Sequence, residues 1–252
     1  MTLPRTPSFR LDGRRALVAG GSRGIGLGCA MALAEAGAHV IVAARGEAEL
    51  DRAVAEMLAA GLSAEALVLD VTDRGAVVAA MDGIGPLDVL VNSAGLARHT
   101  PALETEEGDY DAVMAVNVKA AYHLAQEGAR RMGDAGGVII QISSQMGHVG
   151  GIDRAVYCAS KHAVEGMTKA MAIEWGARGI RVNTVCPTFI RTPLTEATFA
   201  DPEKRAWIES KIKLGRVGRV EDVMGAVLFL ASDAAAMVTG TSILVDGGWT
   251  AG

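Results

Sequence analysis

The sequence predicts one α/β domain built on a doubly wound, seven-stranded parallel sheet with helices on both faces. Short apolar runs rich in Val, Ile and Leu alternate with longer helical stretches along the chain. Strands and helices in this order pair in parallel through right-handed crossovers. The 252 residues, half of them hydrophobic, suffice for a substantial core without disulfides or metal ions. We therefore expect residues 1–252 to form one doubly wound domain.

The apolar runs define the predicted strands, and their composition is typical of strands buried on both faces of a parallel sheet. In chain order they are Ala16–Ala19, Val40–Ala43, Ala66–Leu69, Val89–Val91, Val138–Ile142, Val182–Val185 and Ile243–Val245. The helical stretches between them are Gly24–Ala36, Glu47–Ala60, Asp73–Asp82, Gly108–Met132, Ala155–Arg178 and Val220–Ala231.

One long segment, Thr192–Gly218, does not follow the alternation; it mixes two prolines and two aromatic residues with charges. Long irregular insertions in compact domains often serve function, which favours a lid over the substrate. A surface excursion with one or two packed helices explains the same composition equally well.

Charge and cysteine content exclude several classes of protein. The net charge is -5 and the basic residues are scattered, so we expect no nucleic acid and no membrane as partner. Cys29, Cys158 and Cys186 lie far apart without the spacing of a zinc site, so we expect no metal and a reducing, cytoplasmic compartment. Residues 1–11 lack the apolar core of a signal peptide, and residues 135–152 predict a buried strand and loop rather than a membrane span.

A glycine-rich turn follows the first predicted strand and leads directly into a helix. It reads Gly20-Gly21-Ser22-Arg23-Gly24-Ile25-Gly26. Glycines let the backbone approach a pyrophosphate closely, and the helix start supplies unpaired N–H groups and a positive dipole end. The glycines alone are weak evidence, but their place at the first strand-to-helix turn predicts a dinucleotide site.

The end of the second strand indicates which dinucleotide is bound. Enzymes that prefer NAD usually place an acid there for the ribose 2′-hydroxyl, whereas this segment contains no carboxylate and is followed by Arg45. Together with Arg23, this arginine suits a 2′-phosphate, so we predict NADP(H) in preference to NAD(H), which stays possible. The alternative is that both arginines are ordinary solvated residues.

Tyr157 and Lys161 lie four residues apart at the start of a predicted helix and therefore share a face. An ammonium beside a phenol stabilises the phenolate, which suits acid–base catalysis. Ser144 follows a strand at the carboxyl edge of the sheet, where doubly wound folds bind ligands. Alone, the spacing equally fits a half-buried tyrosine beside a solvated lysine.

Taken together, these motifs resemble the short-chain dehydrogenase/reductase family along nearly the whole chain. The resemblance implies a catalytic tetrad of Asn117, Ser144, Tyr157 and Lys161. Tyr157 would exchange a proton with the substrate oxygen while Ser144 hydrogen-bonds that oxygen. Lys161 would support the tyrosine and bind the nicotinamide ribose, and Asn117 would help to hold a proton-relaying water chain. The resemblance also implies that residues 1–252 form a single Rossmann-type, dinucleotide-binding catalytic domain and that the protein is a homotetramer.

Further site residues are carried over by the same resemblance. Additional cofactor contacts are expected at Asp70, Val71, Asn92, Ala94, Gly95, Pro187, Ile190 and Thr192. The wall of the substrate pocket is expected to include Gln145, Met146, His148, Val149, Ile152, Arg154, Thr188 and Phe189, with parts of Thr192–Gly218. Thr188 stands where the family commonly has Gly, so its side chain bears on substrate class.

The expected reaction is hydride transfer between NADP(H) and a ketone or secondary alcohol. The motifs are similar to those of 3-oxoacyl-carrier-protein reductases and gluconate 5-dehydrogenases, which leaves 3-oxoacyl thioesters, keto-sugar acids, polyols and similar small carbonyls open. Epimerases and dehydratases need an added domain, and divergent enoyl reductases space their Tyr and Lys more widely. A noncatalytic NADP(H)-binding regulator of the same fold is the alternative from another class.

Overall fold

The computed structural model describes residues 2–252, and Met1 lies outside the described residues. Its sheet has the order β3-β2-β1-β4-β5-β6-β7, and every neighbouring pair is parallel. The strands are β1 (Arg15–Ala19), β2 (His39–Ala44), β3 (Ala64–Val68), β4 (Val89–Asn92), β5 (Gly137–Ile142), β6 (Ile180–Pro187) and β7 (Ser242–Val245). The predicted all-parallel sheet is confirmed, with the reversal of strand order between β1 and β4.

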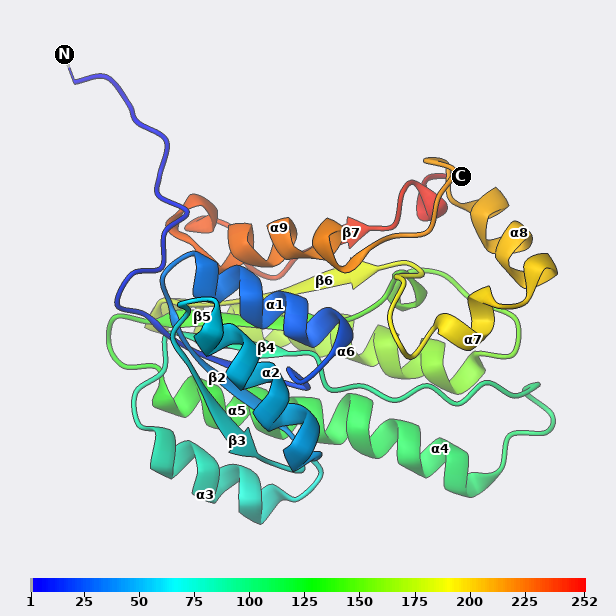
Figure 1. Ribbon diagram of the computed structural model, residues 1–252, viewed down its shortest axis with the longest axis horizontal. Helices are drawn as coiled ribbons and strands as arrows, with labels where there is room; N and C mark the ends of the chain where they lie inside the picture. Colours follow the sequence, from blue (N-terminus) through cyan, green and yellow to red (C-terminus); the bar gives the residue numbers. More distant parts are fainter. Residues whose placement is uncertain (1) are drawn as a thin grey trace.

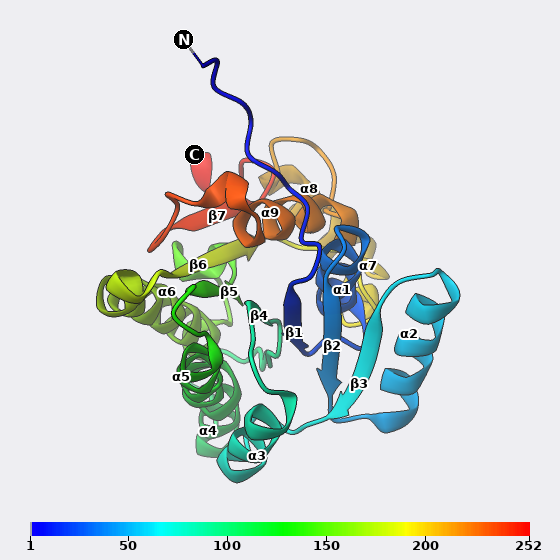
Figure 2. The same ribbon diagram turned by 90° about the vertical axis from the view of Figure 1, so that its left-hand side faces the viewer.

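Helices cover both faces of the sheet (Figures 1 and 2). One face carries α1 (Gly24–Glu35), α2 (Glu47–Ala59) and α9 (Val220–Ala231), and the other carries α3 (Arg74–Ile84), α5 (Ala121–Arg131) and α6 (Ala155–Trp175). Alternation along β1 supplies both layers, because Ala16 and Val18 join the first core cluster while Leu17 and Ala19 join the second.

Two strands depart from the prediction of burial on both faces. In β3 only Ala64 is buried, and no residue of β7 is fully buried. Both strands are edges with a single neighbour, β2 and β6 respectively, so less of their surface is covered. The apolar composition of these runs marked them as strands but did not distinguish an edge from the centre.

The segment 192–218 folds into two short helices, α7 (Glu196–Phe199) and α8 (Pro202–Lys211). They enclose a small apolar cluster of Phe199, Ile208, Ile212 and Val217, separate from the two main cores. Figure 1 shows both helices beyond the tip of β6, at the carboxyl edge of the sheet. The segment is therefore ordered structure beside the edge where ligands bind in such folds.

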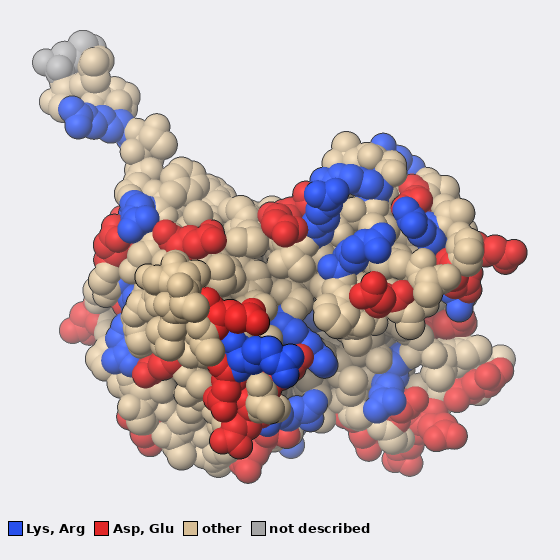
Figure 3. Space-filling view, in the orientation of Figure 1, with Lys and Arg blue, Asp and Glu red and all other residues tan. Residues whose placement is uncertain are grey.

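Acidic and basic side chains are interspersed over the face of the molecule in Figure 3. Among residues 2–252, no helix is both long and apolar enough to cross a bilayer.

Candidate active site

The turn after β1 forms a cradle of backbone atoms, and side chains in place of its glycines would fill that cradle. A Cβ on Gly26 would lie 1.9 Å from the carbonyl oxygen of Gly20, and Gly20 and Gly24 have φ of 74° and 54°. Only glycine tolerates such approach and such dihedrals without strain. The first turn of α1 has no side-chain cap from Arg23, so its N–H groups stay available for an anion. The turn thus fits the pyrophosphate of a dinucleotide, and Ile25 packs partly buried on the core behind it.

Side chains around this turn form a network with two carboxylates. Ser22 Oγ donates to Glu49 at 3.1 Å, and Arg23 pairs with the same carboxylate at 3.6 Å. Arg45 lies 3.9 Å from Asp70, with most of its side chain exposed. Hydrogen bonds from Thr72, aided by the charge of Arg45, lower the pKa of Asp70 despite its partial burial. Glu49, on α2, was not predicted as part of this region, because nothing in its local sequence sets it apart from other acids at a helix start.

The end of β4 connects the glycine turn to the predicted catalytic residues. A Cβ on Gly20 would lie 2.8 Å from Ala94 N. On the other side, a Cβ on Gly95 would lie 3.7 Å from Asn117 Oδ1 and 3.9 Å from Lys161 Nζ. Asn92 fixes this segment by donating to Gln141 at 2.8 Å and accepting from Ala94 N at 3.2 Å.

Asn117 lies in a π-helical segment, Ala115–Ala120, between α4 (Glu107–Met114) and α5. The sequence predicted one unbroken helix over 108–132 and missed this turn. Such insertions widen a helix locally and are frequent at functional sites. Buried Asn117 donates to Leu96 O at 2.9 Å and accepts from Leu96 N at 2.8 Å. It also donates to Ser160 at 3.0 Å, which ties the loop after β4 to α6.

Tyr157 and Lys161 share one face of α6, as predicted. Lys161 Nζ lies 5.7 Å from the centre of the tyrosine ring and donates to Ile142 O at 3.0 Å. Ser160, between them in sequence, is fully buried and donates to Tyr157 O at 2.7 Å. This serine was not predicted as a site residue; its only signal is a small polar residue on the buried side of the helix.

Ser144 caps the short helix Gln145–Gly147 after β5, accepting from Met146 N at 3.1 Å. Its hydroxyl proton therefore remains free for another acceptor. This loop packs closely against α6: a Cβ built on Gly147 would lie only 3.1 Å from the carbonyl oxygen of Lys161. The strand end thus brings Ser144 beside the helix that carries Tyr157 and Lys161.

The remaining predicted cofactor residues lie on two other strand ends. After β3, Val71 packs against the second core cluster beside Asp70. After β6, which ends at Pro187, the chain returns toward the first helix, and a Cβ on Gly24 would lie 3.4 Å from Thr192. Buried Ile190 forms a bridge with Gly218, which closes the base of the segment 192–218. The predicted cofactor residues therefore line one continuous edge of the sheet.

The predicted pocket residues differ in exposure. Met146 is buried and Ile152 is largely exposed. Gln145 Oε1 and Thr188 Oγ1 are buried and have no hydrogen-bond partner among residues 2–252. The Phe189 ring packs against Trp249 at an interplanar angle of 34°, and Trp249 in turn packs edge-on against Trp207 of α8. The C-terminal Trp249 was missed, because its contact depends on how α8 folds back.

His148 faces a buried carboxylate that the sequence did not single out. Glu165, one turn beyond Lys161, accepts from Thr184 at 2.9 Å, from Ser242 at 2.5 Å and from the Cys186 thiol at 3.3 Å. His148 Nε2 lies 3.5 Å from Cys186 Sγ and 3.8 Å from Glu165. Burial, and next the charge of Glu165, raise the pKa of Cys186 to about 12. One potential metal-binding atom from each of His148, Glu165 and Cys186 lies within 4.8 Å of the other two. Sequence spacing could not reveal this cluster.

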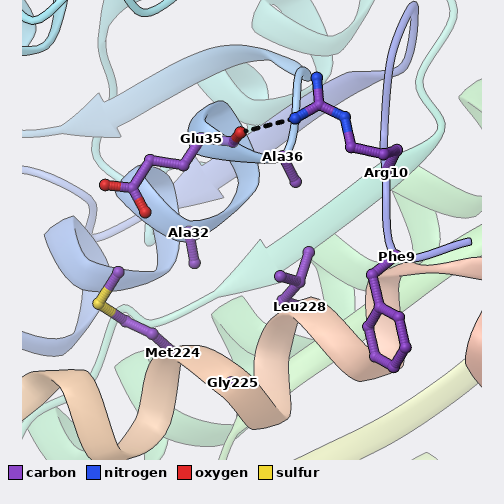
Figure 4. A pocket seen from close by; sticks show the side chains of 8 residues that line it. All are labelled: Phe9, Arg10, Ala32, Glu35, Ala36, Met224, Gly225 and Leu228. Atoms are coloured by element: carbon purple, nitrogen blue, oxygen red, sulfur yellow. Dashed lines mark hydrogen bonds between the residues drawn. The ribbon is translucent and has the colours of Figure 1, made fainter.

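A pocket of about 310 Å³ lies elsewhere, between the N-terminal segment, α1 and α9 (Figure 4). Phe9 closes one end and Arg10 reaches over α1, donating to Glu35 O at 3.1 Å. None of the predicted site residues lines it.

Comparison with known proteins agrees with this geometry. A family model described as enoyl-(acyl carrier protein) reductase matches residues 19–250. L-xylulose reductase of Bos taurus is 41% identical over 96% of this chain and 99% of the relative. Gluconate 5-dehydrogenase of Gluconobacter oxydans (strain 621H) is 41% identical over 96% of each chain. The crystal structure of a gluconate 5-dehydrogenase from Burkholderia cenocepacia J2315, in complex with NADP and tartrate, has a TM-score of 0.93 at 38% identity, covering 97% of this chain and 98% of that one. The chain therefore belongs to the short-chain dehydrogenase/reductase family.

Proposed function

We propose that this protein is an NADP(H)-dependent oxidoreductase that interconverts a secondary alcohol and a ketone in a sugar, sugar acid or polyol. The observation that carries the proposal is the convergence of Asn117, Ser144, Tyr157 and Lys161 beside the glycine cradle. Similarity to L-xylulose reductase and gluconate 5-dehydrogenase supports sugar-like substrates over 3-oxoacyl thioesters.

The glycine cradle, the free N–H groups of α1 and the Asn92–Gly95 segment would hold the dinucleotide. Arg45 and Arg23 would bind the 2′-phosphate of NADP(H), exchanging their exposed contacts with Asp70 and Glu49 for a doubly charged partner. The related gluconate 5-dehydrogenase from Burkholderia cenocepacia, whose crystal structure contains NADP, supports this preference.

A nicotinamide held at this edge would supply or accept the hydride, which leaves the proton and the developing charge to the side chains. Tyr157 gives its phenolic proton to the carbonyl oxygen during reduction and takes it back during oxidation. The ammonium of Lys161, held by Ile142 O, stabilises the phenolate electrostatically. Ser144 donates its free proton to the same substrate oxygen. Asn117 keeps the loop after β4 in place between the cofactor edge and α6.

We also propose that residues 192–218 close over the substrate, since α7 and α8 lie at the carboxyl edge and contact Phe189 through Trp249. The buried free thiols of Cys29, Cys158 and Cys186 favour a reducing, cytoplasmic compartment.

A homotetramer is the proposed assembly. Exposed apolar side chains support it, including Tyr110 and Tyr122 on α4 and α5, Ile173 on α6 and Leu244 on β7. Light scattering is expected to give four times the chain mass, and a stable monomer would contradict this proposal.

The test of the proposed function is NADPH oxidation across L-xylulose, 5-keto-D-gluconate, a 3-oxoacyl thioester and cyclohexanone, with NADH in parallel. We expect turnover of at least one polyhydroxylated ketone, with a higher kcat/KM for NADPH than for NADH. Absence of turnover with every carbonyl would contradict the proposed reaction, and a clear NADH preference would contradict the cofactor assignment.

A further inference from the structure

Arg154 lies close in sequence to the proposed catalytic tyrosine and contacts the predicted pocket wall. It lies immediately before the first residue of α6, three residues ahead of Tyr157. Its guanidinium carbon lies 5.1 Å from the centre of the Phe189 ring, in the segment that follows β6. A cation stacked on an aromatic face keeps its N–H edge free for an in-plane acceptor. Arg154 therefore joins the start of the catalytic helix to the predicted pocket wall.

The backbone holds Arg154 in this position. Asp153, just before it, has φ of 57° and is the one non-glycine residue with positive φ among residues 2–252. Its carbonyl accepts from Thr100 N at 3.1 Å, which connects the turn to the loop after β4. In the same loop, the His99 ring packs edge-on against Tyr157 with centres 5.9 Å apart. These two contacts hold the turn before Arg154 and the Tyr157 ring against the loop after β4.

Arg154 lacks an anionic partner within the described part of the chain. No carboxylate there lies within 4.0 Å of it, and it donates no hydrogen bond, whereas partly buried Arg178 and Arg181 donate to backbone carbonyls. Burial lowers the pKa of Arg154, opposed by Tyr157, Cys158 and Asp153. Burial, and next the charge of Arg154, lower the pKa of His99. An unpaired guanidinium that is partly withdrawn from water calls for an anion.

From this arrangement we infer that Arg154 binds the carboxylate of the substrate, so that the preferred substrates are keto-sugar acids and their hydroxy-acid products rather than neutral ketoses and polyols. The inference rests on the proposed function and narrows it. Guanidinium and carboxylate match in a bidentate geometry that neutral sugars cannot provide. The relatives differ in the charge of the compounds in their names. L-xylulose is neutral, whereas gluconate and tartrate are acids.

The test compares 5-keto-D-gluconate with L-sorbose, which share a carbon skeleton and ketone and differ only in a carboxylate replacing a hydroxymethyl group. In the wild-type enzyme we expect kcat/KM with NADPH to favour the keto acid. Arg154→Met keeps an apolar stem on Phe189 and should lower that preference at least tenfold, with Arg154→Lys between the two. Arg98→Met, which removes a cation of the loop after β4 that is already paired with Asp109 at 3.7 Å, should leave the preference within about twofold.

Inhibition of the reductase by substrate analogues provides a second measurement, which does not depend on knowing the best carbonyl substrate. Tartrate and threitol share four carbons and differ only in their two carboxylates. Tartrate should inhibit more strongly than threitol, and Arg154→Met should remove the difference. A wild-type preference for L-sorbose, equal inhibition by the two compounds, or an unchanged ratio in Arg154→Met would overturn the inference while leaving ketone reduction intact. Loss of all carbonyl turnover would instead reject the proposed function.

Discussion

Arg45 and Arg23 show how single side chains set the choice of cofactor. Each makes only an exposed contact with a carboxylate, at 3.9 Å and 3.6 Å. Exposed pairs of this kind contribute little to stability, so a phosphate can replace them at small cost. The two arginines are thus available for the cofactor.

Arg45→Ala should raise the KM for NADPH about tenfold or more while changing that for NADH little, because a charge-assisted hydrogen bond is worth about 1.5–3 kcal/mol. Steady-state kinetics with both cofactors measure this. Arg52→Ala, an exposed position on α2, is the control and should alter neither. Equal losses for the two cofactors would reject 2′-phosphate binding by Arg45.

The candidate site was predictable where chemistry depends on local spacing. Tyr157 and Lys161 share a helical face because they lie four residues apart, and the glycines of the turn follow a strand directly. Contacts made across the fold were not predictable. Glu49, Ser160 and Glu165 reach the site region only because separate strands and helices meet at one edge, which no local pattern records.

At the level of elements, the π-helical segment around Asn117 shows the limit of periodicity. Residues 108–132 carry a continuous helical pattern, and the sequence predicted both ends closely. The extra residue in the turn is stabilised by the hydrogen bonds that Asn117 makes to Leu96 and Ser160, outside its own helix. Such tertiary contacts are invisible to a pattern of apolar positions.

Asn117→Ala should lower the free energy of unfolding by about 1–3 kcal/mol, because the N–H and C=O of Leu96 lose their partner. Urea unfolding measures this, with Lys119→Ala, at an exposed position of the same segment, as the matched control. A stability equal to that of the control would show that the π segment does not depend on Asn117.

The start of α9 depends on pH through Asp222. Two hydrogen bonds from Arg216, and next one from Arg219 N, lower the pKa of Asp222 to about 2. Because the folded pKa is below the unfolded value, this contribution is present at pH above about 4 and is lost as pH falls toward 2. The Asp222 side chain is 31% exposed and its partner Arg216 is 50% exposed, so solvent screening keeps the contribution below about 1 kcal/mol.

Asp222→Asn should therefore lower stability slightly at pH 7, and the difference should vanish near pH 2. Urea unfolding at several pH values checks this, with the exposed neighbour Glu221→Gln as control. A difference that persists unchanged at low pH would refute the role of the carboxylate charge.

Across the whole molecule, Glu165 connects elements that lie far apart in sequence. It sits on α6 and accepts hydrogen bonds from Thr184 and Cys186 of β6 and from Ser242 of β7. Edge strand β7 has only β6 as a neighbour in the sheet, so this buried carboxylate supplements its backbone pairing. The fold class followed from the alternation of strands and helices, whereas this link between layers depends on the final packing.

Glu165→Gln should lower the free energy of unfolding by about 1–3 kcal/mol, because an amide replaces a charged acceptor that faces three donors. Chemical unfolding tests this, with Glu174→Gln, exposed on the same helix, as control. Wild-type stability in Glu165→Gln would mean that the network contributes nothing to the packing of α6 on the sheet.

In the proposed mechanism Tyr157 transfers the proton, while the rest of the carboxyl edge of the sheet binds the cofactor. Tyr157→Phe removes one oxygen and leaves the Asn117, Ser160 and Lys161 contacts to the backbone in place. The most direct measurement is therefore kcat of Tyr157→Phe with the best carbonyl substrate, alongside its Kd for NADPH. We expect a loss of kcat of about 10²-fold or more with an almost unchanged Kd. Retained turnover in Tyr157→Phe would contradict proton transfer by Tyr157.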